Sequence, residues 1–345
     1  ESEMAERDWT YRLIALPDAA DRTLAIRANG SVCAAAQADC KHLARMAADL
    51  PPDSATVVVR YVFNPDLHAS KEGERLSVYL MGRAHCDVRS GALGLLLGRG
   101  PLPRIYRLKP EPAPAVNWDQ FSATCDVVRR FCVFPSTLTA ELNPLALSHY
   151  IQIHSFEPAG EHDDLRLDKV LDRVQEPVLL EVAVEPCDTS PLLTAHTNYL
   201  ARLKEINQTW DTDEEDAGRS SWTHGEWSSF VASLKHRDPL AEDVGRTQQR
   251  FHETLTKRHL RFHIRVLAGT PAVARLLAST IAENAFAGGS YQLIDTVRGD
   301  AFFENALQAH RELCVAVPPV LPCFADGPLD DLCSALSPLS NLPVA

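Results

Sequence analysis

The sequence lacks the short motifs that identify the common catalytic folds. It has no GxxxxGK[ST] phosphate-binding loop, no GxSxG nucleophile turn and no HExxH zinc-binding helix. Its nearest glycine-rich stretch, GALGLLLGRG at 91–100, has no Lys-Ser or Lys-Thr after the glycines, which favours a helix end over a nucleotide cradle. We therefore expect no catalytic residue, no metal and no cofactor in this chain.

Long hydrophobic runs and paired cysteines are missing too. No stretch approaches the roughly 18 uncharged apolar residues of a membrane span, and charges are scattered through the first 30 residues. The nine cysteines show no CxxC spacing, which argues against a zinc knuckle and a disulfide framework. We expect reduced thiols, with Cys125 and Cys132 buried, and a cytoplasmic protein without a membrane span.

A general basic surface is absent. The net charge is −12, from 34 basic and 46 acidic residues, so a protein that coats nucleic acid is not expected. Basic residues do gather locally, and one interpretation of them is a contact with phosphate or DNA. Because only one aromatic residue, Tyr106, lies among them, a solvated face or a subunit contact is favoured. The patch comprises Arg83, Arg89, Arg99, Arg104, Arg107 and Lys109.

Hydrophobic patterning predicts an α+β fold. Alternating or β-branched runs predict strands at 9–16, 22–28, 54–64, 75–84, 104–108, 149–156, 177–188, 260–269 and 290–297. Periodicity and capping residues predict helices at 31–50, 87–98, 118–134, 163–176 and 270–289. In the second half this order predicts a ferredoxin-like sandwich, with helices on one face of an antiparallel sheet.

The expected domain organisation follows from this pattern and from Pro-rich connectors. We predict an N-terminal α+β domain at 1–112, which is a possible second sandwich, and a connector helix and loop at 113–148. A ferredoxin-like domain at 149–333 would contain a long helical insert at 190–258, and 334–345 would form a linker-like tail.

One polar cluster is a candidate site, whereas a histidine-rich stretch is not. Carboxylates gather around one histidine after the predicted strand at 149–156, an arrangement that suits metal or acid–base chemistry. The favoured interpretation is that an Asp caps the following helix. The cluster comprises Glu157, Glu161, His162, Asp163 and Asp164. The histidine-rich stretch, with His252, His259 and His263, crosses a change from helix to strand and is interpreted as surface and edge residues.

Three of the five tryptophans lie in one acidic stretch of the insert, 209–230. Trp210, Trp222 and Trp227 would suit a partner-docking arm, because tryptophan contributes much of the binding energy at interfaces. They would equally suit aromatic anchors that hold the insert to its own domain. The sequence leaves both interpretations open.

Residues 154–188 and 250–294 together resemble the region that precedes the P-loop core of HerA/FtsK-like ATPases, including relatives of the conjugative type IV secretion ATPases. The ending SALSPLSNLPVA, at 334–345, resembles the approach to that core, so the resemblance covers about 150–345. It implies a non-catalytic assembly and docking region of a DNA- or protein-translocating motor. A homo-oligomer, a hexamer in that family, and a protein partner would then be expected.

The same resemblance implies that ATP and Mg²⁺ bind in a motor domain beyond this chain, so none of the family's catalytic residues carries over. Two alternatives remain. One is a stand-alone adaptor of a defence or secretion system, and the other is an enzyme that uses the acidic cluster at 157–164.

Overall fold

The computed structural model describes residues 7–15, 44–66, 75–84, 106–112, 114–129, 170–171, 173–191, 193–194, 196–198, 200–201, 246, 249, 252–253, 256–285, 291–316 and 326–328. The chain forms two compact units. One comprises residues 1–130, 157–187 and 258–345, and the other comprises 131–156 and 188–257. Within the described ranges, no helix has the length and apolar character needed to cross a membrane.

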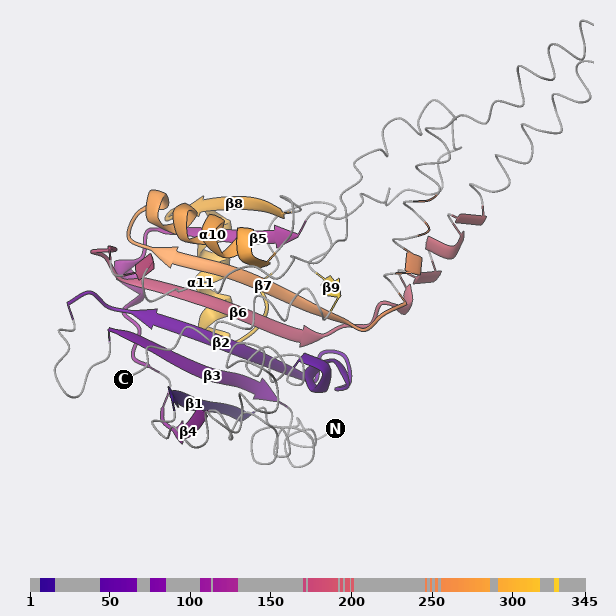
Figure 1. Cartoon of the computed structure of the whole chain (residues 1–345), viewed down its shortest axis with the longest axis horizontal. Helices are drawn as coiled ribbons and strands as arrows, with labels where there is room; N and C mark the ends of the chain where they lie inside the picture. The colour runs from indigo at the N-terminus through magenta and orange to yellow at the C-terminus, as the bar shows by residue number, and fades with distance from the viewer. Residues whose placement is uncertain are drawn as a thin grey trace, which may run out of the picture. The chain divides into compact units, whose positions relative to one another are not determined.

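One antiparallel sheet organises the first unit (Figure 1). Its strand order is β4-β1-β3-β2-β6-β7-β5-β8, and β9 pairs with β7 beside β5. Every neighbouring pair is antiparallel. The predicted α+β class with an antiparallel sheet is therefore confirmed. The strands are β1 (Arg7–Ala15), β2 (Ala55–Phe63), β3 (Leu76–Ala84), β4 (Tyr106–Pro110), β5 (Ala123–Arg129), β6 (Val178–Pro186), β7 (His259–Ala268), β8 (Tyr291–Val297) and β9 (Asp326–Pro328).

The sheet consists of two halves with the same internal order. Read inward from one edge, strands β1 to β4 lie in the order fourth, first, third, second, and strands β5 to β8 have the same order when read inward from the other edge. The second strands of the two halves, β2 and β6, join them, with Val57 opposite Val184 and Phe63 opposite Val178. Strands from both sides of the expected domain boundary at residue 112 thus belong to one sheet.

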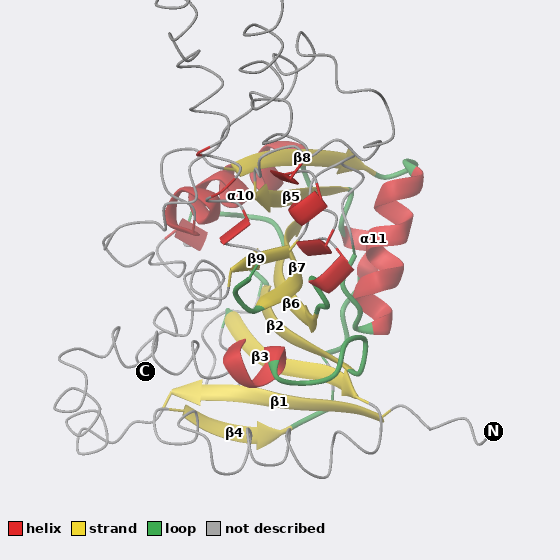
Figure 2. Ribbon diagram, turned by 90° about the vertical axis from the view of Figure 1, so that its right-hand side faces the viewer, coloured by secondary structure: helices red, strands yellow, loops and turns green. Residues whose placement is uncertain are grey.

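The central strands are hydrophobic because both of their faces are covered. All residues of β2 except Val62, and all of β6 except Glu185, are buried. Residues such as Val57 and Val182 face a large core that includes helix α10 (Pro271–Ala285). Their neighbours face the opposite side, where helix α11 (Ala301–Glu312) packs. The two helices lie on opposite sides of the sheet in Figure 2.

The two helices have different amphipathic faces. In α10, Ala274, Leu277, Ala278 and Ile281 are buried at helical spacing. The buried face of α11 carries Phe303, Ala306, Leu307, Ala309 and His310. Its first turn is capped by Asp300, whose side chain accepts a hydrogen bond from the Phe302 backbone N–H.

Several expectations agree with these elements, and two were wrong. The strands predicted at 9–16, 54–64, 75–84, 104–108, 177–188, 260–269 and 290–297 correspond to β1, β2, β3, β4, β6, β7 and β8, and the helix at 270–289 corresponds to α10. The helix predicted at 118–134 is wrong, because a short 3₁₀ turn (Trp118–Gln120) precedes strand β5 there. In β5, Cys125 and Val127 face the α10 side, whereas Thr124 and Asp126 make polar contacts on the other face. This alternation has the period of a strand.

The predicted placement of all helices on one face is also wrong. The helical residues 44–48 and α10 do share a face and a core, which includes Ala44 and Ala47. The opposite face of β6 and β7 presents Leu179 and Leu267, which are apolar and need cover. Helix α11, for which no helix was predicted, packs Phe303 and Leu307 against them.

In the second unit, residues 190–201 are helical at each described position. Asp188 precedes this segment and accepts a hydrogen bond from the Ser190 N–H, 2.9 Å away. The rings of His196 and His252 stack with their Nδ1 atoms 3.3 Å apart.

Candidate functional site

Four central strands each carry one charged residue at the same level of the sheet. Arg60 of β2 lies opposite Glu181 of β6, and Glu181 lies opposite Arg265 of β7. Arg265 in turn lies opposite Asp126 of β5 and donates to both of its carboxylate oxygens, at 2.5 and 2.8 Å. All four residues are at most 3% exposed. The signs alternate along this row, so each buried charge has an opposite charge beside it, as burial requires.

Glu181 is the centre of this buried charged row. Its Oε2 accepts a hydrogen bond from Nε of Arg60 at 2.6 Å. Its Oε1 lies 3.1 Å from Nε2 of His263 on β7 and 2.6 Å from Nδ1 of His310 on α11. Burial disfavours the charged carboxylate, but the Arg60 charge and the two histidine contacts outweigh it and hold the pKa of Glu181 well below its ordinary value. Glu181 is therefore a carboxylate that joins three elements.

The hydrogen bonds indicate which histidine nitrogens carry protons. Nδ1 of His263 accepts from the backbone N–H of Ala316 at 2.9 Å, so Nε2 of His263 is the nitrogen that donates to Glu181. Burial lowers the pKa of His310 to about 4, although Glu181 acts in the opposite sense. His310 is thus neutral at pH 7 and donates from Nδ1. Its Nε2 has no hydrogen-bond partner among the described residues.

Glu181, His263 and His310 place three potential metal-ligand atoms within 4.8 Å of one another. Their arrangement does not suit a cation. Ligand atoms of a tetrahedral zinc ion lie about 3.3 Å apart, given bonds of about 2 Å, whereas Oε1 of Glu181 and Nδ1 of His310 are 2.6 Å apart. The second nitrogen of a metal-bound histidine normally donates a hydrogen bond, but that of His263 accepts one. Arg60 adds a fixed positive charge on the same carboxylate.

The surroundings of Glu181 are closed by protein. The Trp118 ring stacks on His310, with ring centroids 6.2 Å apart and planes inclined at 16°. The Arg60 guanidinium lies 5.6 Å from the centroid of Trp118 and donates to the backbone carbonyl of His310 at 2.7 Å. Acid–base catalysis needs substrate within hydrogen-bonding reach of the catalytic group. Glu181 and His310 are both 0% exposed, so neither is placed for such a contact with substrate. The cluster is instead suited to holding α11 on the sheet.

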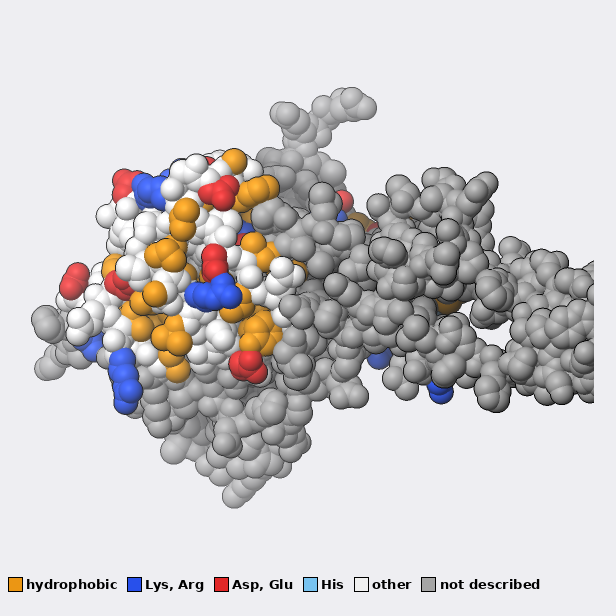
Figure 3. All heavy atoms as spheres, turned by 90° about the horizontal axis from the view of Figure 1, so that it is seen from above, with side chains coloured by type: hydrophobic (Ala, Val, Ile, Leu, Met, Phe, Trp, Pro, Cys, Tyr) orange, Lys and Arg blue, Asp and Glu red, His pale blue; other side chains and the backbone are white. Residues whose placement is uncertain are grey.

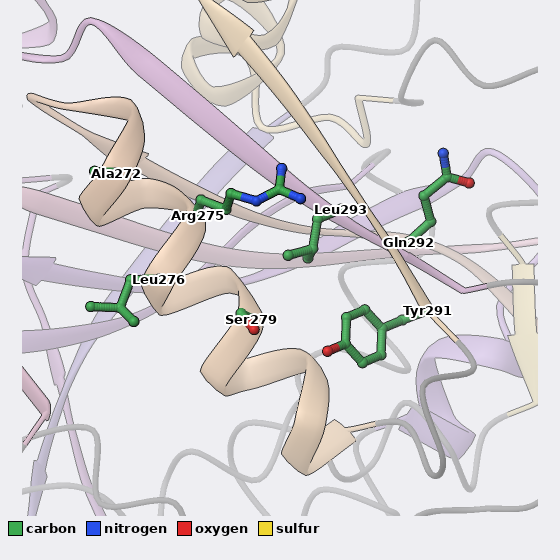
Figure 4. Close-up of a pocket in the computed structure, with 7 residues that line it drawn as sticks. All are labelled: Ala272, Arg275, Leu276, Ser279, Tyr291, Gln292 and Leu293. Atoms are coloured by element: carbon green, nitrogen blue, oxygen red, sulfur yellow. The ribbon is translucent and has the colours of Figure 1, made fainter.

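An exposed feature lies at the end of the sheet, where β8 is the terminal strand. Its outer edge pairs with no other described strand. A groove of about 640 Å³ runs between β8 and α10, lined by Ala272, Arg275, Leu276, Ser279, Tyr291, Gln292 and Leu293. Tyr291 and Leu293 point from β8 towards α10, whereas Gln292 points away (Figure 4). Within the part of the chain that the structure describes, strand β8 therefore has an unpaired edge with a groove beside it.

Exposed apolar side chains occur on β8 and on the two helices that precede and follow it. The three most exposed large hydrophobic residues of the described chain are Leu276 on α10, Val297 at the end of β8 and Phe302 at the start of α11, with 62%, 49% and 48% exposure. Figure 3 views the molecule from the β8 end and shows hydrophobic side chains spread over the described surface, with acidic and basic side chains between and around them. Asp295, the one charged residue of β8, forms an ion pair with Arg275. We call Leu276, Val297 and Phe302 the apolar fringe of β8.

Few of the residues singled out in the sequence lie in described parts of the chain. Arg83 pairs with Asp8 at 2.9 Å, and Lys109 pairs with Glu111 at 2.5 Å. Arg107 lies on β4, but its side chain is not described. The remaining basic candidates (Arg89, Arg99 and Arg104), the acidic cluster (Glu157, Glu161, His162, Asp163 and Asp164), Cys132 and the tryptophans (Trp210, Trp222 and Trp227) lie outside the described residues.

The histidine and cysteine expectations had opposite outcomes. Cys125 is buried, as expected, and burial raises the pKa of its thiol. The interpretation of His259 and His263 as surface and edge residues is wrong, because they are only 5% and 2% exposed. Both lie on β7, where sheet neighbours and the segment after α11 cover them.

The charged row was not predicted from the sequence, although a signal for it was present. Each of the four apolar strand runs, VVVRYVF, VLLEVAV, FHIRVLA and ATCDVV, contains a single Arg, Glu or Asp. Two positive and two negative charges in strands buried on both faces could be neutralised by pairing across the sheet. Chain order did not indicate that β6, β7 and β5 are adjacent, so the pairing was not recognised.

No protein-family model matches this chain, and no curated protein sequence matches it. Its function must therefore be inferred from its own geometry.

Proposed function

We propose that this chain is a non-catalytic assembly and docking region, and that the open edge of β8 is its docking surface. The observation that carries the proposal is the apolar fringe: Leu276 lines the groove beside β8, Val297 ends β8, and Phe302 follows it in the first turn of α11, and all three are exposed. Folded proteins usually protect an edge strand with charge, proline or a covering element, because its free backbone groups can pair with another chain. An unprotected edge with exposed hydrophobic neighbours is typical of an interaction site.

The opposite edge of the sheet supports this assignment by contrast. Strand β4 has five residues, ends at Pro110 and carries Lys109, which is about half exposed. A short edge strand with a lysine and a proline resists pairing. Strand β8 has seven residues, and its one charge is already paired with Arg275.

The buried charged row supports a structural role rather than turnover. Glu181 already accepts from Arg60, His263 and His310, and none of these side chains is more than 3% exposed. A general acid or base must reach its substrate. This favours the non-catalytic reading over an enzyme built on the described polar residues.

We further propose a ferredoxin-like arrangement for each half of the sheet and a long helical arm for the insert at 190–258. The order fourth, first, third, second in both halves supports the first proposal, because it is the order of that fold. Helical backbone at each described position of 190–201 supports the second. In this proposal α11 is an addition that covers the second face.

The resemblance to the region before a HerA/FtsK-like motor core provides a context for such a module. In that setting it would assemble subunits or receive partners, while ATP and Mg²⁺ would bind elsewhere. Direct DNA contact through the basic patch is less favoured, because Arg83 and Lys109 already have acidic partners in Asp8 and Glu111. The stand-alone adaptor remains the second setting for the same docking surface.

The test is the size of the native particle that contains this chain. Gel filtration of fresh cell extract, followed by immunodetection, should show the wild-type chain above its 38.1 kDa monomer mass. Leu276→Lys adds a charge to the apolar fringe at a side chain that is mostly exposed and so should leave the fold intact. We expect this variant to elute as a smaller particle, whereas Lys109→Ala, on the opposite edge, should elute like the wild type. Unchanged elution of Leu276→Lys would contradict the docking role.

A further inference from the structure

The open edge of β8 is suited to pairing with β8 of a second copy of this chain. We propose that two copies form a two-fold dimer in which the two β8 strands pair in antiparallel fashion around Ile294. This inference rests on the proposed docking function and names its partner.

Strand direction is compatible with this pairing. A two-fold axis perpendicular to the sheet makes the two β8 strands antiparallel and keeps the α10 faces of both copies on the same side. Every pair within the sheet is already antiparallel. The chain itself contains a junction of this kind, since β2 and β6 join two halves of identical strand order. The dimer would extend the same sheet across the axis.

The sequence of β8, YQLIDTV, is compatible with itself in this register. Centring on Ile294 pairs all seven residues, with Tyr291 opposite Val297, Gln292 opposite Thr296 and Leu293 opposite Asp295 of the second copy. The two Asp295 side chains therefore do not face each other, and like charges directly opposite would be destabilising. Each Asp295 is also neutralised by Arg275 of its own chain. The net charge of −12 is thus not concentrated on this edge.

The apolar fringe provides the hydrophobic surface for such a contact. Leu276 and Val297 lie along the α10 side of β8, and Phe302 lies just beyond its end. In this register Val297 of each copy lies opposite Tyr291 of the other copy, at either end of the paired strands, and burying apolar surface there is favourable. Pairing of β8 with β4 of another copy is disfavoured by Lys109 and Pro110. The assembly therefore closes as a dimer and does not propagate along the sheet.

Sedimentation equilibrium of the purified full chain tests the stoichiometry. We expect a species of twice 38.1 kDa whose population falls on dilution. Val297→Lys changes a residue that is half exposed and would place one added charge at each end of the paired strands, opposite Tyr291 of the other copy, so the dissociation constant should rise at least tenfold. Lys109→Ala should leave it unchanged. Circular dichroism should show that both variants remain folded.

Cysteine cross-linking tests the register. Ile294→Cys places two thiols opposite each other at the two-fold axis, and mild oxidation should give a covalent dimer above the wild-type background. Lys109→Cys, on the opposite edge, should give none above that background. A chain that is monomeric throughout, or that cross-links through position 109 and not 294, would overturn the dimer.

The two proposals fail in distinguishable ways. If the purified chain is monomeric while Leu276→Lys still reduces the size of the particle in extract, the partner is another molecule and the docking role stands. If the purified chain is monomeric and Leu276→Lys has no effect in extract, both proposals are wrong. A dimer that Val297→Lys dissociates supports both.

Discussion

Arg60 and Glu181 face each other across β2 and β6, with Nε of the arginine 2.6 Å from Oε2 of the glutamate. Their side chains are 3% and 0% exposed. Since an unpaired buried charge is far more costly than a paired one, neither partner can be removed alone without destabilising the fold. The pair links the two halves of the sheet at their shared boundary.

Replacing Glu181 with Gln should therefore destabilise the protein strongly. The variant keeps the volume of the side chain but removes the charge that faces Arg60. We expect the free energy of unfolding to fall by about 3–5 kcal/mol, the usual cost of breaking a buried ion pair. Urea denaturation followed by far-UV circular dichroism measures this change.

Glu111→Gln is the matched control, because Glu111 makes ion pairs with Lys109 and Arg12 near the surface. Exposed pairs contribute about 0–1 kcal/mol, so this variant should unfold close to the wild-type midpoint. Equal losses in the two variants would show that burial of the Arg60–Glu181 pair has no special energetic role.

Acidification should destabilise the native state through His310. Its pKa is about 4 in the folded protein, against 6.5 for an ordinary histidine. Between these values the unfolded chain binds a proton that the native state does not bind, so stability falls as the pH falls from 6.5 to 4. The contribution of His310 is about 3 kcal/mol, at about 1.4 kcal/mol per pKa unit. Below pH 4.5 the lowered pKa of Glu181 acts in the same direction.

Denaturant unfolding from pH 7 to pH 4 measures this dependence. The matched variant is His310→Gln, because its side-chain amide can still donate to Glu181 but does not titrate. We expect a shallower loss of stability between pH 6.5 and 4 in this variant. An unchanged slope would assign the acid sensitivity to other groups.

The sequence was sufficient for elements whose periodicity is unambiguous. Strand β2 is a run of β-branched and aromatic residues, and α10 begins with Pro271 and repeats apolar residues at helical spacing. Strand β5 was mistaken for a helix because Phe121, Cys125, Val128 and Cys132 also fit a helical spacing over a short window. A short window with both spacings cannot decide between helix and strand.

Helix α11 and the charged row were both missing from the predictions, each for its own reason. The local signals of α11 were present: Asp300 as a cap, then Phe303, Leu307 and His310 at helical intervals. Prediction of the charged row would instead have required knowing which strands are neighbours in the sheet. Asp126 and Arg265 are far apart in the sequence and meet only because β5 and β7 are neighbours in the sheet. Such contacts follow from topology, which local patterning does not determine.

A side chain at Gly82 should be poorly tolerated. Gly82 lies on β3 opposite Trp9 of β1, and a Cβ atom there would overlap the Trp9 ring and the backbone carbonyl oxygen of Thr56. We expect Gly82→Ala to lower the free energy of unfolding by about 1–3 kcal/mol, as overpacking of a filled site does. Denaturation in urea and the near-UV circular dichroism of Trp9 both report the change.

Gly269→Ala is the comparison for this substitution. The nearest atom to its new Cβ would be Oε2 of Glu176 at 3.2 Å, which is the end of a flexible side chain. Its cost should stay within about 1 kcal/mol. A smaller loss of unfolding free energy for Gly82→Ala than for Gly269→Ala would be incompatible with the close packing of Trp9 on β3.

The adjacent residues Phe302 and Phe303 provide the sharpest test of how α11 packs. Phe303 is 0% exposed and contacts the cluster that contains Leu179 and Leu267, whereas Phe302 is 48% exposed. Phe303→Ala should lower the free energy of unfolding by about 3–5 kcal/mol, because it leaves a cavity between the helix and the sheet. Phe302→Ala makes the same chemical change one residue earlier, and under dilute, monomeric conditions it should cost less than about 1 kcal/mol. Guanidinium unfolding of both variants at equal protein concentration measures the difference. Equal or reversed losses of unfolding free energy would mean that α11 presents a different face to the sheet. Because His310 lies on the same helical face as Phe303, its contact with Glu181 would then be wrong as well.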